Sequence, residues 1–108
     1  MKRRTVKPVD QLKAYEQKER MYFEAEGKCF HCGKLIPSVN QSQLAHRIPQ
    51  WDRLIEQYGE AVIYHEDNMD ITCSLACNKK SEISPKSRPL EVMALADSIL
   101  KKLEDENV

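Results

Sequence analysis

The first regular pattern of apolar and polar side chains along the chain is that of a helix. Residues 11–26 favour helical structure, Asp10 is suited to cap the helix start, and Gly27 is suited to end it. A mostly apolar stripe recurs at helical spacing in this stretch: Leu12, Tyr15, Glu19, Tyr22 and Phe23. We therefore expect an amphipathic helix at the start of the chain.

Shorter patterns follow in the middle of the chain. Residues 42–48 alternate in part between apolar and polar side chains and end at Pro49, which predicts a strand. Pro49 also suits the start of a short helix that Gly59 would end. Residues 61–64 are then expected to return as a second strand beside the first.

A last amphipathic helix is expected near the end of the chain. Residues 84–89 are rich in helix-breaking residues, and the stretch from about 90 to 103 repeats apolar side chains at helical spacing. Its expected face consists of Met93, Ala96, Ile99, Leu100 and Leu103. The sequence thus predicts one α+β domain with a basic tail and helix (1–27), a core (28–82), and a linker with a helix (83–108).

Composition narrows the choice of partners. With 108 residues the chain has room for one domain with a small apolar core, and its 17 basic and 17 acidic residues cancel. The basic residues nevertheless gather in two stretches: Lys2, Arg3, Arg4, Lys7, Lys13, Lys18 and Arg20, then Lys79, Lys80, Lys86 and Arg88. A phosphate backbone could contact such surfaces, although solvated helix faces have the same composition.

The expected location is intracellular. No apolar run is long enough to span a membrane, and the charged start of the chain has no hydrophobic segment behind it. We therefore expect a soluble cytoplasmic protein, in the host cytoplasm if a phage encodes it, with no membrane partner.

Four cysteines form two close pairs, Cys29 with Cys32 and Cys73 with Cys77. In a reducing compartment this spacing is typical of zinc ligands, with disulfides or free thiols as the alternatives. Gly33 permits the tight turn of a zinc knuckle around the first pair. The second pair, four residues apart, can face one side of a helical turn. A structural Zn²⁺ ion is thus expected to stabilise this small fold.

A knuckle carrying one cysteine pair and a helix start carrying the other, with a hairpin between them, is the plan of a treble-clef zinc site. With the motifs between and after the pairs added, residues 29–80 resemble the HNH endonucleases, the ββα-metal group of nucleases, and most closely the small phage and bacterial HNH proteins. The resemblance rests on Cys29-x-x-Cys32, His46-Arg47-Ile48-Pro49, Asn68, and Cys73-x-x-x-Cys77-Asn78-x-Lys80. It implies a ββα-metal finger on a treble-clef zinc site with four cysteine ligands, flanked by N- and C-terminal helices.

The resemblance also assigns roles to single residues. It aligns His46 with the general base of a phosphodiesterase, and imidazole is the side chain whose ordinary pKa lies near neutrality. It aligns Asn68 with the asparagine that ties its loop to the strand carrying the base. It aligns Asn78 with a ligand of a catalytic divalent cation, Mg²⁺, Mn²⁺ or Ni²⁺. Turn or surface asparagines and a structural histidine are the alternative interpretations of these three residues.

This chain departs from the family at Ala45. Most active members carry aspartate or histidine at this position, immediately before the base, where the side chain binds the catalytic metal. Alanine has no donor atom. The substitutes considered are Asp67, Asp70 and above all His65, because His65 would end the strand expected beside the one that carries His46.

The implied partner is DNA, contacted by Arg47, Lys79 and Lys80, and a homodimer or a phage packaging partner is further considered. His31, inside the knuckle, is interpreted as an exposed residue or a phosphate contact rather than a fifth zinc ligand. The rival function is a non-catalytic nucleic-acid-binding treble clef whose nuclease site has decayed at Ala45. A protein-interaction module like the RING domains also fits the cysteines but gives no role to His46, Asn68 and Asn78.

Overall fold

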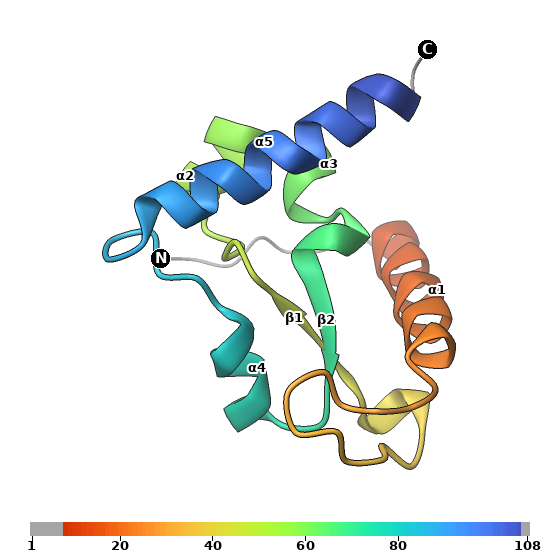
Figure 1. Ribbon diagram of the computed structural model, residues 1–108. Coiled ribbons are helices and arrows are strands. Elements are labelled where there is room, and N and C mark those ends of the chain that lie inside the picture. Colours follow the sequence, from red (N-terminus) through yellow and green to blue (C-terminus); the bar gives the residue numbers. More distant parts are fainter. Residues whose placement is uncertain (1–7, 107–108) are drawn as a thin grey trace.

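Two short antiparallel strands, β1 (Gln43–His46) and β2 (Met69–Thr72), lie between helix α1 (Pro8–Glu24) and helix α4 (Leu75–Ser81) in the computed structural model (Figure 1). The register pairs Ala45 with Asp70 and His46 with Met69. The structure describes residues 8–106, so the expected basic residues Lys2, Arg3, Arg4 and Lys7 lie outside it. The expected α+β class is confirmed.

The remaining elements surround this hairpin. Helix α5 (Pro89–Glu106) lies across the two short helices α2 (Asp52–Tyr58) and α3 (Glu60–Ile63) at the end of the sheet where β1 finishes (Figure 1). Two 3-10 turns, η1 (Val39–Gln41) and η2 (Glu66–Asn68), precede β1 and β2. None of the helices formed by residues 8–106 has the length and apolar character needed to cross a membrane.

The larger core lies under α5. Its buried side chains are Ile48, Leu54, Ile55, Val62, Ile63, Ile83, Val92, Ala96 and Ile99. The expected α5 face was only partly right, because Met93 and Leu100 stay 49% and 38% exposed while Val92 is buried. Helix α5 is therefore rotated relative to the stripe that the spacing alone favoured.

A second, smaller cluster of buried side chains contains two of the cysteines and packs against α1 and the sheet. Ile36 and Ile71 pack there with Cys29 and Cys77, and Met21, Tyr22, Ala25, Leu44 and Cys73 pack against them. The stripe expected for α1 was wrong in part, because Leu12, Tyr15 and Phe23 are exposed. Only the last turns of α1 reach the core, so a stripe along the whole helix has nothing to pack on.

The second strand expected at residues 61–64 was wrong, because this segment is helix α3. The backbone N–H of Tyr64 donates to Glu60 O at 2.9 Å, as in a helical turn. Val62 and Ile63 are both buried in the larger core, and a short apolar run of this kind does not reveal its period. The strand that pairs with β1 is instead β2.

Glycines end two of the helices as expected. Gly27 has φ +70° and donates its N–H to Tyr22 O at 2.9 Å, which closes the end of α1. Gly59, with φ +93°, ends α2. The helix starts differ from expectation, because α1 already begins at Pro8, ahead of Asp10, and α2 begins at Asp52 rather than Pro49.

Candidate functional site

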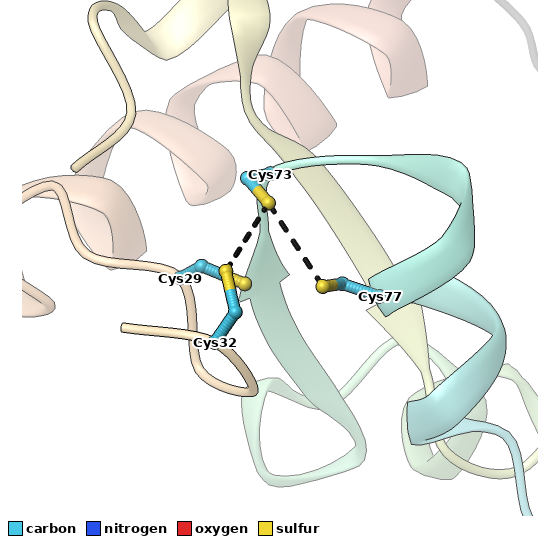
Figure 2. Close-up of side chains that lie close together, drawn as sticks. All are labelled: Cys29, Cys32, Cys73 and Cys77. Atoms are coloured by element: carbon cyan, nitrogen blue, oxygen red, sulfur yellow. Dashed lines mark hydrogen bonds between the residues drawn. The ribbon is translucent and has the colours of Figure 1, made fainter. Parts of the chain in front are cut away.

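The two cysteine pairs meet at one end of the hairpin (Figure 2). Cys29 and Cys32 lie in the loop after α1, Cys73 follows β2, and Cys77 lies in the first turn of α4. Their four Sγ atoms are all within 4.8 Å of one another.

The spacing of the sulfur atoms fits zinc. The Cys32 and Cys73 sulfurs are 3.5 Å apart, and the Cys73 and Cys77 sulfurs are 3.9 Å apart. A tetrahedral ion with Zn–S bonds of about 2.3 Å needs sulfurs roughly 3.8 Å apart. The four thiols are thus positioned to hold a metal ion, and four thiolates suit structural zinc.

Local backbone geometry prepares this arrangement. Gly33, at φ +73°, allows the knuckle to turn, and its N–H donates to Cys29 O at 3.0 Å. Ser74 caps α4, because its hydroxyl oxygen accepts the Cys77 N–H at 3.3 Å. The Phe30 N–H donates to Ile71 O at 2.8 Å, which fixes the knuckle to β2.

The thiols differ in acidity. Burial raises the pKa of the Cys29 thiol, but backbone N–H groups of Cys32, His31 and Cys73 outweigh this effect and lower the pKa to about 6. The hydrogen bond with the Cys32 sulfur is the main cause that raises the pKa of Cys73 to about 11. The lowered pKa favours the thiolate form of Cys29, the form that binds metal.

His46 ends β1 and is half-buried. Its Nδ1 accepts a hydrogen bond from the Gln50 side-chain N–H at 3.1 Å. Its ring meets the Tyr64 ring nearly at right angles, with centroids 5.8 Å apart. These two neighbours orient the imidazole at the end of the strand.

Asn68 holds the backbone that follows His46. It is fully buried, its Oδ1 accepts the Ile48 N–H at 2.7 Å, and its Nδ2 donates to the carbonyl oxygens of Ile48 at 3.1 Å and Ile63 at 2.9 Å. The Asn68 carbonyl also accepts the Arg47 N–H at 2.8 Å. The expected contact between the Asn68 loop and the strand carrying His46 is thus present.

Asn78 lies on α4, directly after Cys77, and is half-buried. Its Nδ2 donates to the side-chain oxygen of Gln43 at 3.2 Å, so it meets β1 three residues before His46. Among the described residues, the four cysteines are the one group of three or more His, Cys, Asp or Glu side chains placed to share a metal ion. Within residues 8–106 there is therefore no second group of three or more His, Cys, Asp or Glu side chains placed to bind a catalytic cation.

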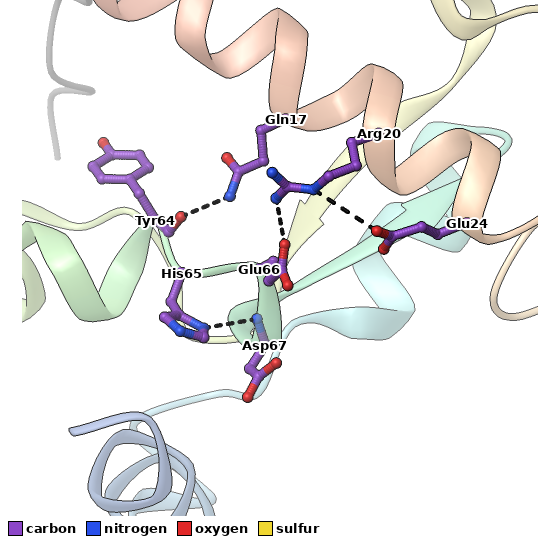
Figure 3. A network of polar contacts seen from close by, with 7 residues as sticks. All are labelled: Gln17, Arg20, Glu24, Tyr64, His65, Glu66 and Asp67. Atoms are coloured by element: carbon purple, nitrogen blue, oxygen red, sulfur yellow. Dashed lines mark hydrogen bonds and ion pairs between the residues drawn. The ribbon is translucent and has the colours of Figure 1, made fainter. Parts of the chain in front are cut away.

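The placement expected for His65 was wrong. His65 precedes η2 rather than ending a strand, and its Nδ1 accepts the Asp67 N–H at 3.1 Å. Figure 3 shows it in a polar network where α1 meets η2, including an ion pair between Arg20 and Glu66. Lys102 of α5 pairs with Asp67 in the same region. Because residues 60–63 form helix α3, His65 does not end a strand beside β1.

A chain of three polar side chains was not foreseen from the sequence. His31 is exposed, as expected, but its Nε2 lies 2.5 Å from the Ser81 hydroxyl, and that hydroxyl donates to Asp70 Oδ2 at 2.9 Å. The chain links the knuckle, α4 and β2. No local spacing signals it, since its members are 11 or more residues apart in the sequence.

The residues assigned to DNA contacts lie close to these elements. Lys79 and Lys80 are exposed in the last turn of α4, and Arg47 is half-buried directly after β1. The Arg47 carbonyl accepts the Ile83 N–H at 2.8 Å, which brings the end of α4 to the end of β1.

No family model, curated protein or solved structure matches this chain.

Proposed function

We propose that this protein is a zinc-stabilised HNH endonuclease that hydrolyses DNA phosphodiester bonds with His46 as the general base. The observation that carries the proposal is a pair of hydrogen bonds. The side-chain amide of Asn68 accepts the N–H and donates to the C=O of Ile48, two residues after His46. This contact is the one that the family resemblance assigns to its middle asparagine. Helix α4 packs on both strands and begins at the cysteine cluster. This arrangement supports the same ββα-metal, treble-clef interpretation.

The chemistry of His46 suits the proposed step. Its imidazole would take a proton from a water molecule, whose oxygen attacks the phosphorus while the bond from phosphorus to the 3'-oxygen breaks and that oxygen leaves, to be protonated to the 3'-hydroxyl. Tyr64 packs against the ring and orients it, and Nδ1 would take the proton only after the Gln50 N–H that it accepts has moved away. The resemblance implies products with 5'-phosphate and 3'-hydroxyl ends.

The zinc ion has a structural role in this proposal. Four thiolates, from Cys29, Cys32, Cys73 and Cys77, would hold it and would leave no position for water or phosphate. Zinc bound there would join the knuckle to the start of α4, so its binding free energy would be folding free energy.

A divalent cation, Mg²⁺, Mn²⁺ or Ni²⁺, would neutralise the phosphate charge when bound. The site offers this cation few protein ligands. Asn78 offers one amide oxygen, while Ala45 is fully buried and has no donor atom. Lys79, Lys80 and Arg47 supply positive charge for the DNA backbone.

The deciding experiment is plasmid nicking by zinc-loaded protein with added Mg²⁺, Mn²⁺ or Ni²⁺. His46→Ala should abolish nicking. His65→Ala is the matched control, because His65 is also half-buried but lies in the network around η2. Equal nicking by the parent and His46→Ala would exclude His46 as the base.

A non-catalytic nucleic-acid-binding protein is the second candidate. It is favoured by Ala45 and by the lack of a second metal-binding group of His, Cys, Asp or Glu within residues 8–106. This candidate requires DNA binding by the parent protein without nicking in any of the three metals.

A further inference from the structure

Asp70 on β2 carries a buried carboxylate that has no cationic partner among the described residues. It is 9% exposed, and it is the one Asp, Glu, Lys or Arg among the buried residues that the structure describes. Its Oδ2 accepts the Ser81 hydroxyl at 2.9 Å. None of the ion pairs formed within the described part of the chain includes it. Burying a charge is costly unless a counter-ion or a metal compensates it, so this carboxylate lacks the positive charge that its burial calls for.

The sheet register sets Asp70 beside the position where the family resemblance leaves a donor missing. Asp70 pairs with Ala45 across the two antiparallel strands. Paired residues project from the same face of a sheet, with Cβ atoms about 4.5–5.5 Å apart. Ala45 has no donor atom and directly precedes His46. A carboxylate from β2 is thus present on the same face, directly opposite the β1 residue that offers none.

Helix α4 packs on both strands and contributes polar side chains to this face. Ser81 of α4 contacts Asp70. Asn78 contacts Gln43, which precedes Ala45 by two residues on β1 and therefore shares its face. Asn78 and Ser81 are three residues apart, so they lie on one side of the helix. The side chains of Asp70 and Asn78 thus belong to the same interface between α4 and the sheet.

The donor atoms of this interface suit a hard divalent cation. Mg²⁺ and Mn²⁺ prefer carboxylate and amide oxygens to thiolates. Mg²⁺ is commonly held by one or two carboxylates, while water and substrate phosphates complete its coordination shell. One carboxylate and one amide therefore meet the need of such a cation without a group of three His, Cys, Asp or Glu side chains.

We propose that Asp70 is the carboxylate ligand of the divalent cation, in place of the donor that is missing at Ala45, and that Asn78 is a second ligand. The inference rests on the proposed function and names the carboxylate that its cation site otherwise lacks. Ser81 orients the Asp70 carboxylate through Oδ2, which leaves Oδ1 for the cation. Binding there would compensate the buried charge of Asp70.

The test is a titration of zinc-loaded full-length protein with Mn²⁺ in the absence of DNA, followed by electron paramagnetic resonance of the free ion. Asp70→Asn keeps the size of the side chain and an acceptor for Ser81, but it removes the charge. It should weaken Mn²⁺ binding by at least roughly tenfold, since even the loss of a residue that supports a metal ligand costs about 10- to 100-fold. A parent that binds no Mn²⁺, or an Asp70→Asn variant with the parent's affinity, would overturn the proposal.

Two control variants separate cation binding from packing and from general negative charge. Ser81→Ala removes the hydrogen bond to Asp70 but keeps the carboxylate, so it should lose clearly less Mn²⁺ affinity than Asp70→Asn. Asp67→Asn removes a carboxylate that lies in η2 and pairs with Lys102, so it should bind Mn²⁺ as the parent does. A loss in either control equal to that in Asp70→Asn would overturn the proposal.

The two proposals fail separately. A parent protein that nicks DNA while Asp70→Asn keeps its Mn²⁺ affinity would retain the endonuclease and remove Asp70 as the ligand. A parent that never nicks, but loses Mn²⁺ affinity with Asp70→Asn, would retain the cation site and remove the endonuclease.

Discussion

Replacing Asn68 with alanine should strongly destabilise the protein. The substitution leaves three backbone groups in the interior without their partner: the N–H and C=O of Ile48 and the C=O of Ile63. Asn68 is fully buried, so bulk water does not replace these contacts directly. The side-chain contact between η2 and the residues after β1 is lost, while the hydrogen bond from the Arg47 N–H to the backbone carbonyl of residue 68 remains.

The size of the loss follows from the three hydrogen bonds. A buried polar group left unpaired costs about 1–3 kcal/mol. Water entering the space vacated by the amide would satisfy part of this demand, so we expect about 3–5 kcal/mol in total. Domains of this size have a free energy of unfolding of about 5–15 kcal/mol, so the variant should remain marginally folded.

The assay is urea unfolding of zinc-loaded protein followed by circular dichroism. With a slope of about 1–3 kcal/mol per M, the midpoint should fall by on the order of 1–5 M. Asn68→Asp keeps the size of the side chain and the acceptor for the Ile48 N–H, but it loses both donated hydrogen bonds and should be destabilised by a similar amount.

Asn40→Ala is the control, because Asn40 is exposed in η1. It should shift the free energy of unfolding by less than about 0.5 kcal/mol. A loss below about 1 kcal/mol in Asn68→Ala would show that the amide does not support the turn after His46.

Two further predictions concern the knuckle. Cys73→Ser removes one of the four thiols, so it should lower the melting temperature and the zinc content measured by metal analysis. A variant that keeps the parent's circular dichroism and melting profile in chelator would contradict a folding role for zinc. Ser81→Ala and His31→Ala should each destabilise by about 1 kcal/mol, and the double variant should lose clearly less than their sum, because both remove the same contact. Additive losses in thermal unfolding would mean that the two side chains are not coupled.

Local chemistry accounts for the features that the sequence predicted well. Gly27 and Gly59 end helices because they adopt positive φ angles, which strain other residues. The cysteine spacing anticipated a common cluster, since a knuckle and a helical turn each present two sulfurs to one ion. Asn68 was singled out by its motif, and its amide contacts the backbone of Ile48, while its role in a nuclease site stays a prediction.

Three errors arose where packing between distant segments outweighs local pattern. Residues 61–64 form α3 because Val62 and Ile63 are both needed in the core under α5, a demand that an alternating strand would not meet. His65 therefore lies in the network around η2 and does not end a strand. The stripes expected on α1 and α5 were partly wrong because the spacing of apolar residues does not say where along a helix, or at what rotation, its neighbours lie.

The sequence by itself determined the α+β class, the four cysteines that are positioned to hold a metal ion, and the residues that merit testing as a nuclease site. Only the tertiary structure decided which strand pairs with β1, and that His31 joins Asp70 through Ser81. The physical reason is the distance along the chain over which each interaction acts. Turn geometry and ligand spacing act over a few residues, whereas strand pairing, helix rotation and buried hydrogen bonds depend on segments that meet only after the chain has folded.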